Sequence, residues 1–152
     1  MTDLLISISG PSQERPPHPP GTVAWLEDFA ARVRNVDFER ARRLFSPTIF
    51  GFGTKADAYD SLDEWHHDQW SHVWPRTTGF RFDLMTLRTI LSVDGSLCCI
   101  ACEWGSKGAR EDGSLFQRHG RSSILLARTS SNELGWVGVH SHFSMPPGPV
   151  DS

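Results

Sequence analysis

The 152-residue sequence has little tyrosine, little cysteine and no excess of basic residues. Its formal net charge of −3 argues against a nucleic-acid-binding face, which normally shows as a cluster of Lys and Arg. No apolar run approaches the ~18 residues that a membrane-spanning helix needs, and the first residues lack the basic segment of a signal peptide. We therefore predict a cytoplasmic protein that has neither a nucleic acid nor a membrane as its partner.

The cysteines Cys98, Cys99 and Cys102 all lie within one apolar stretch. Cys99 and Cys102 have the C-x-x-C spacing, but residues three apart on a strand point to opposite faces, which does not suit a metal site or a redox pair. A zinc site would also need a second Cys or His pair at finger-like spacing, and the sequence offers none. We interpret the cysteines as small buried side chains and predict neither a metal nor a cofactor.

Aromatic residues are the main departure from an average composition, with six Trp and nine Phe against one Tyr. The hydrophobic fraction of 38% and the charged fraction of 22% are typical of a globular protein. At this length the chain most simply forms one domain around a single core. The aromatic side chains fit a hollow lined by rings, and they fit a closed core equally well.

The order of patterns along the chain predicts an α+β fold. Residues 1–21 are rich in proline and are expected to form an N-terminal tail, residues 22–147 the domain, and residues 148–152 a C-terminal tail. Apolar spacing after Thr22, Asp37 and Ser61 predicts three helices, each begun by one of these capping residues and the third closed by Pro75. A short strand is expected at residues 48–54, and long strands at 80–93, 97–105, 115–128 and 134–145. Together they predict one curved antiparallel sheet with the helices on one side.

The last long strand carries two histidines on one face. Period-two alternation places the following residues together: Trp136, Gly138, His140, His142 and Ser144. A strand face that carries two imidazoles is either exposed to solvent or lines a cavity. We expect the cavity, because the neighbouring strand can supply a second polar wall.

Several segments resemble the SnoaL-like proteins of the nuclear transport factor 2 and ketosteroid isomerase superfamily. The resemblance rests on Gly120–Leu126 (GRSSILL), on Gly135–Ser144 (GWVGVHSHFS), and on Gly51-Phe52-Gly53-Thr54 before a Trp-bearing helix. The association domain of calcium/calmodulin-dependent protein kinases ends similarly. The likeness covers about residues 22–147. It implies a cystatin-like, cone-shaped α+β barrel, in which the sheet wraps around the N-terminal helices, encloses a pocket and forms a homodimer. Superfamily members include isomerases, cyclases, dehydratases, binders and assembly modules, so the fold leaves the activity open.

The predicted pocket combines polar groups from three strands with an apolar wall. His119, Arg121 and Ser123 alternate on the strand next to the His-bearing one. Arg121 is expected to anchor a carboxylate or enolate oxygen, because its planar guanidinium group can donate two hydrogen bonds in parallel. His140 or His142 would transfer a proton, and Glu103 is the preferred inward carboxylate. The remaining candidates are substrate-binding residues: His119, Ser144, Trp65, Trp70 and Phe52.

These residues lead to two hypotheses about function. The first is a small-molecule-binding dimer, acting as a polyketide- or steroid-type isomerase, cyclase or dehydratase on a hydrophobic ligand with an anionic or carbonyl group. The alternative is a non-catalytic homo-oligomerisation module, which a pocket filled by its own side chains would favour. A metal site made by His140 and His142 with His66, His67 or His72 is less favoured, since a His-x-His pair alone is common.

Overall fold

The computed structural model describes residues 6–11 and 17–148. The helical segments are α1 (Thr22–Arg34), α2 (Phe38–Arg42), α3 (Leu62–Trp65), the π-helical turn η1 (His66–Trp70), α4 (Ser71–Val73) and the 3₁₀ turn η2 (Trp74–Arg76). The strands are β1 (Ile6–Ser9), β2 (Phe45–Phe52), β3 (Ala58–Tyr59), β4 (Thr77–Ser92), β5 (Leu97–Ala109), β6 (Leu115–Arg128) and β7 (Trp136–Ser144). Within these residues, no helix has both the length and the apolar character needed to cross a membrane.

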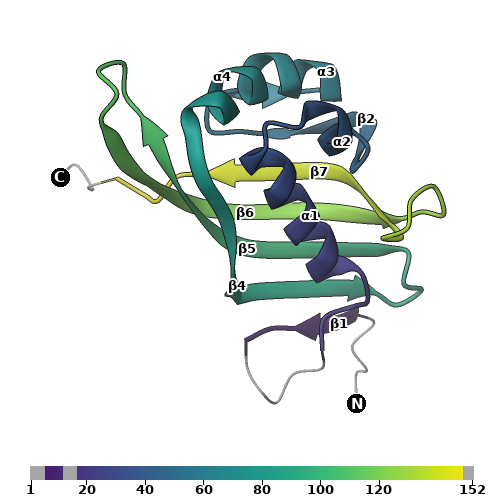
Figure 1. The fold of residues 1–152 in the computed structure, drawn as a ribbon. Coiled ribbons are helices and arrows are strands. Elements are labelled where there is room, and N and C mark those ends of the chain that lie inside the picture. The colour runs from purple at the N-terminus through teal and green to yellow at the C-terminus, as the bar shows by residue number, and fades with distance from the viewer. Residues whose placement is uncertain (1–5, 12–16, 149–152) are drawn as a thin grey trace.

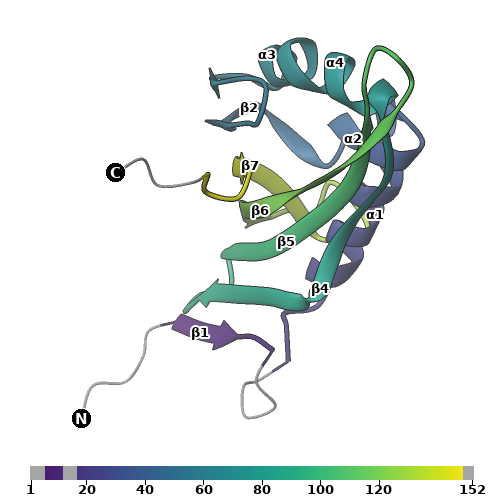
Figure 2. The same cartoon turned by 90° about the vertical axis from the view of Figure 1, so that its left-hand side faces the viewer.

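The strands form one seven-stranded sheet in the order β1-β4-β5-β6-β7-β2-β3. Every pairing is antiparallel except that of β2 with β7, which is parallel. Figures 1 and 2 show the sheet curving around α1, with α3 and α4 above the end that carries β2. The predicted α+β fold with a curved sheet is confirmed. The sheet remains open, with β1 and β3 as its edge strands.

The two faces of the sheet differ sharply, and we call the helix-covered one the inner face and the other the outer face. Along β5 every second residue from Cys98 to Gly108 is buried, which puts the even-numbered side chains on the inner face. Along β6 the buried residues Gly120, Ser122, Ile124 and Leu126 mark the same face. Along β5 and β6, strict alternation thus decides which side chains reach the core.

Helix α1 buries Leu26, Phe29, Ala30 and Val33 against the inner face, as their spacing predicts, and it also buries Trp25. The predicted cap at Thr22 was wrong. Gly21 is the N-cap residue, and the Thr22 hydroxyl donates a hydrogen bond of 2.7 Å to the Pro19 carbonyl. The backbone at Gly21 has φ of 86°, a left-handed conformation that glycine adopts without strain.

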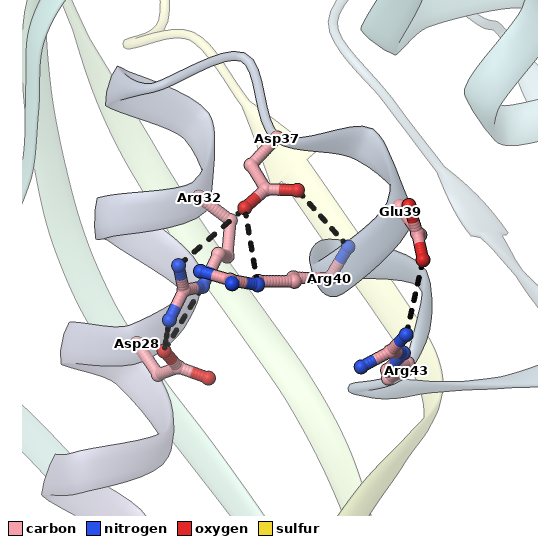
Figure 3. Close-up of polar contacts among 6 residues, drawn as sticks. All are labelled: Asp28, Arg32, Asp37, Glu39, Arg40 and Arg43. Atoms are coloured by element: carbon pink, nitrogen blue, oxygen red, sulfur yellow. Dashed lines mark hydrogen bonds and ion pairs between the residues drawn. The ribbon is translucent and has the colours of Figure 1, made fainter.

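Asp37 caps α2 as predicted and also joins α2 to α1 (Figure 3). One carboxylate oxygen accepts from the Arg40 backbone N–H at 3.2 Å, and the other lies 3.5 Å from Arg32 Nη1. Arg32 in turn pairs with Asp28 at 2.8 Å, while Glu39 and Arg43 form a separate exposed pair at 3.0 Å. Asp37 is therefore the one member of the group that is both a helix cap and a link between helices.

Replacing Asp37 by alanine should lower the free energy of unfolding by about 1–2 kcal/mol. The loss of an N-cap costs about 1 kcal/mol, and the partly exposed pair with Arg32 adds up to about 1 kcal/mol. Urea unfolding followed by Trp fluorescence measures it. Glu39→Ala is the matched control, because its pair is exposed and should cost less than about 0.5 kcal/mol. Equal effects of the two variants would contradict the linking role of Asp37.

The Trp-bearing helix begins where it was predicted but is not a regular α-helix. The Ser61 hydroxyl accepts from the Glu64 N–H at 3.1 Å, so the predicted cap is confirmed. The π turn η1 then adds a residue to one turn, with the Ser71 N–H bonding to the His66 carbonyl. As a result Trp65 and Trp70, five residues apart, both face the core.

Two segments differ from the predicted organisation. Residues 6–9 of the predicted tail form β1, which pairs with β4 from Ile6–Ser92 to Ser9–Thr89. Strand β2 begins at Phe45, three residues before the short strand expected at residues 48–54, and includes Pro47. The predicted tail segments 1–5, 12–16 and 149–152 lie outside the described residues.

Candidate functional site

A small cavity lies between the inner face, α1 and the α3–α4 helical segment. Its lining residues are Phe29, Val33, Thr54, Trp65, Gln69, Trp70, Val73, Trp74, Thr77, Phe80, Trp104, Arg118 and Phe143. Its volume is about 30 Å³, which is room for one or two water molecules. The cavity is thus at the position expected for a ligand pocket, and its own side chains nearly fill it.

Stacked aromatic rings account for this filling. Trp70 and Trp74 stack at 4.4 Å between centroids, and Tyr59 stacks on Trp65 at 4.8 Å. Trp65 and Trp70 therefore do line the cavity, as predicted, but they also belong to the core. The indole N–H groups of both have no hydrogen-bond partner among the described residues, although both side chains are buried.

Arg118 is the charged residue that lines the cavity. It lies on β6, on the same inner face as Gly120 and Ser122, and its side chain is half-buried. Its Nη2 donates a hydrogen bond of 2.8 Å to Thr54 Oγ1, and the guanidinium lies 5.5 Å from the ring centroid of Trp104. Burial lowers the pKa of Arg118 from its ordinary value, because a low-dielectric site disfavours the charged form.

A larger groove continues outward from Arg118. It has a volume of about 610 Å³ and lies between the α4–η2 segment, the β5–β6 hairpin and the loop after β2. Arg118, Thr54, Val73 and Thr77 line both the cavity and the groove. The groove therefore forms the mouth of the cavity, and we call it the mouth groove.

The predicted catalytic and anchoring residues lie on the outer face, away from this cavity. His119 and Arg121 are exposed on β6, Glu103 is exposed on β5, and His142 is exposed on β7. His140 is half-buried on the same face, and its Nδ1 lies 2.9 Å from the Phe50 carbonyl oxygen. The expectation that these side chains face the pocket was wrong; Phe52, 47% exposed, is likewise no part of the cavity lining.

A register irregularity reverses the faces of β7. Trp136 and Gly138 are buried as their alternation predicts, but beyond them Ser141 and Phe143 are the buried residues. The shift falls where Leu125 pairs with His140 and Leu126 with Gly138, so that one strand has an extra residue. A bulge of this kind moves every following side chain to the opposite face.

The predicted set is nevertheless brought together, in rows across the outer face. A charged row contains Asp83, Glu103, Arg121 and Ser144. A middle row contains Arg88, Ala101, Ser123, His142 and Phe52. An apolar row contains Ile8, Ile90, Cys99, Leu125, His140 and Phe50. The histidines contact the phenylalanines: the ring centroids are 4.7 Å apart for Phe50–His140 and 5.4 Å for Phe52–His142.

Groups for acid–base or metal chemistry do not gather in the described interior. The lining of the cavity contains neither a carboxylate nor an imidazole. Within residues 6–11 and 17–148 there is no group of three or more His, Cys, Asp or Glu side chains that could hold a metal ion. Tyr59 belongs to β3 and hydrogen-bonds Ser141, and burial raises its pKa.

Sequence reasoning missed Arg118 and chose Arg121 instead. The two residues lie three apart on β6 and therefore face opposite sides of the sheet. Arg118 could have been identified because it is an even number of residues from Ile124 and Leu126, so that all three face the same side of β6. Ile124 and Leu126 are apolar and fully buried. This alternation places Arg118 on the inner face only if β6 has no bulge between Arg118 and Ile124. The strand meets this condition, because its pairing with β5 is continuous from Leu115 to Ala127.

Solved structures with the same fold cover most of this chain. A nuclear transport factor 2-like superfamily protein from Salmonella enterica is 18% identical, with a TM-score of 0.67, over 82% of this chain and 88% of that chain. The calcium/calmodulin-dependent protein kinase II hub of S. rosetta is 13% identical, with a TM-score of 0.67, over 86% and 99%. A ketosteroid isomerase-like protein from Erwinia carotovora is 9% identical, with a TM-score of 0.65, over 83% and 94%.

A comparison with curated proteins finds no match. The model of the SnoaL-like domain family matches residues 23–148, which is most of the chain. The curved sheet around α1, the aromatic cavity and the order of the elements agree with that match. The chain therefore belongs to the family of SnoaL-like domains.

Proposed function

We propose that this domain is a homodimerisation module whose interface is the outer face of the sheet. The apolar row carries the proposal, because its residues lie side by side across strands β1, β4, β5, β6, β7 and β2, on the face opposite the helices of the described chain. Strands lie ~4.8 Å apart, so the row is roughly 24 Å long. Phe50 is 54% exposed and Ile90 is 40% exposed, values that leave apolar area for a second copy to cover.

The arrangement of charge on the outer face suits a two-fold interface. The charged row lies at one side of the apolar row, with the middle row between them. Stable interfaces have this anatomy, with an apolar centre and a polar rim. In a two-fold dimer the same patch serves both partners, so the apolar rows can cover each other while both charged rows stay at the rim.

The interior supports assembly over catalysis. Ligand pockets commonly have volumes of about 300–1,000 Å³, and the cavity here is about 30 Å³. Its lining also lacks a His, Asp or Glu side chain that could move a proton. Of the structures with the same fold, several are by name kinase hub or association domains, and others are named ketosteroid isomerase-like.

The proposal predicts that Leu125→Glu converts a dimer into a folded monomer. Leu125 is in the middle of the apolar row, where taking a carboxylate out of water at the interface costs several kcal/mol, so we expect the dimer Kd to rise by at least ~100-fold. Analytical ultracentrifugation should then report 17.0 kDa instead of twice that mass. Far-UV circular dichroism shows whether the monomer is folded.

Gln117→Glu is the matched control, because it introduces the same side chain on the outer face of β6 near the hairpin tip, away from the apolar row. It should leave the mass at the dimer value. A wild-type protein that sediments as a monomer at ~100 µM would contradict the proposal. So would a Leu125→Glu variant that remains dimeric.

A further inference from the structure

The mouth groove concentrates positive charge without a compensating acid. Lys55, Arg76 and Arg118 line it together with His72, and among the residues that the structure describes no Asp or Glu side chain does. Among the ion pairs of the described residues, none involves Lys55, Arg76 or Arg118. A concave surface lined by charges of one sign focuses the field and raises the local concentration of ions of the opposite sign.

Arg118 is the member of this set whose charge is most difficult to leave unpaired. Its side chain is half-buried, and the ring beneath it belongs to Trp104, which is 3% exposed. A guanidinium has five N–H donors, and the hydrogen bond that the described structure gives it is the one to Thr54 Oγ1. A partly desolvated cation with free donors is stabilised by an oxyanion that accepts two of them side by side.

The groove also has the size and the apolar walls for an organic ligand. Its volume of about 610 Å³ lies within the usual range for small-molecule sites. Phe116, Val73 and Pro75 provide apolar walls, and Gly108 leaves the space that the Phe116 ring occupies. The filled cavity behind Arg118 confines such a ligand to the groove.

We propose that the mouth groove binds a small aromatic dianion, whose negative oxygens are held by Arg118, Arg76 and Lys55 while its ring lies against the apolar wall of the groove. Two negative charges are expected because three permanent cations line the groove. A phosphate ester and a dicarboxylate share this chemistry. The inference is independent of dimerisation, since the groove lies at the cavity mouth and the proposed interface on the outer face.

Isothermal titration calorimetry with phenyl phosphate, phthalate and phenol tests the site. We expect saturable binding of phenyl phosphate or phthalate and none of phenol. In Arg118→Gln the Kd should rise at least ~10-fold, and in Arg76→Gln a few-fold. Arg121→Gln is the control, because Arg121 lies on the same strand but on the opposite face of the sheet.

The two dianions identify the source of the charge. Binding of phenyl phosphate alone assigns a phosphoryl group, and binding of phthalate alone assigns carboxylates. Absence of saturable binding by both up to ~10 mM overturns the proposal, and so does unchanged affinity in Arg118→Gln. If Arg118→Gln does not fold, Arg76→Gln decides: unchanged affinity in that variant overturns the proposal. The mass of the protein, measured separately, reports on dimerisation alone.

Discussion

Replacing Phe29 by alanine should lower the free energy of unfolding by about 3–5 kcal/mol, the usual cost of removing a buried Phe ring. Phe29 is 2% exposed and lies at the centre of the aromatic core. Its ring centroid is within 6.4 Å of the rings of the following residues: Trp25, Phe45, Trp65, Trp70, Trp74, Phe82 and Phe143. These residues come from α1, β2, the Trp-bearing helical segment, β4 and β7, so one side chain holds the helices on the inner face.

Guanidinium unfolding followed by circular dichroism and by Trp fluorescence measures the loss. A typical domain has a free energy of unfolding of about 5–15 kcal/mol, so this variant should be marginal or unfolded at 37 °C. Phe29→Leu should lose less, because it leaves a smaller cavity. Met85→Ala, at a side chain 82% exposed, should change stability by less than about 0.5 kcal/mol. A Phe29→Ala variant as stable as Met85→Ala would contradict the central position of this ring.

Gly51→Ala should destabilise the protein by about 3 kcal/mol or more, although it adds one methyl group. Gly51 pairs with Ser141 of β7 on one side and with Tyr59 of β3 on the other. A Cβ atom at this position would overlap the Ser141 carbonyl oxygen and the Tyr59 hydroxyl. One of these obstacles is backbone, so the methyl group can be accommodated only if β2 moves away from β7.

Thermal unfolding of the variant should show a midpoint lower by roughly 6–12 °C, since 1 kcal/mol corresponds to about 2–4 °C at this size. Gly105→Ala is the matched control. Its added Cβ would lie 3.1 Å from Arg81 Nη1, the far end of a flexible side chain that can move. We expect a change of less than about 1 kcal/mol there. Equal midpoints for the two variants would show that β2 and β7 are not packed as described.

The order of the elements was readable from the sequence because local rules determine it. Asp37 and Ser61 form the caps that their side chains predict, and the apolar spacing from Val23 to Val33 marks the buried stripe of α1. Strand β1 was not predicted, because the prolines after residue 10 obscured the alternation of Ile6 and Ile8. The β4 residues with which it pairs are eighty or more positions further along the chain, and no local rule reports such a pairing.

The orientation of the site residues was not readable, because it depends on one irregularity. Alternation along β7 is correct as far as Gly138 and reversed from His140 onward. The shift follows from pairing with β6 on one side and with β2 on the other, so it is a property of three strands together. Arg121 was chosen over Arg118 because it was matched to His142, whose own face was reversed.

The short strand β1 has a consequence for the solubility of the molecule. Strand β4 is sixteen residues long and would otherwise offer its whole free edge to another chain. β1 covers the segment from Thr89 to Ser92, and the Arg34 side chain donates to the Phe80 carbonyl at 2.9 Å. The kink between Asp83 and Arg88 interrupts the remainder. Edge-to-edge aggregation through β4 is thus opposed at three places along the strand.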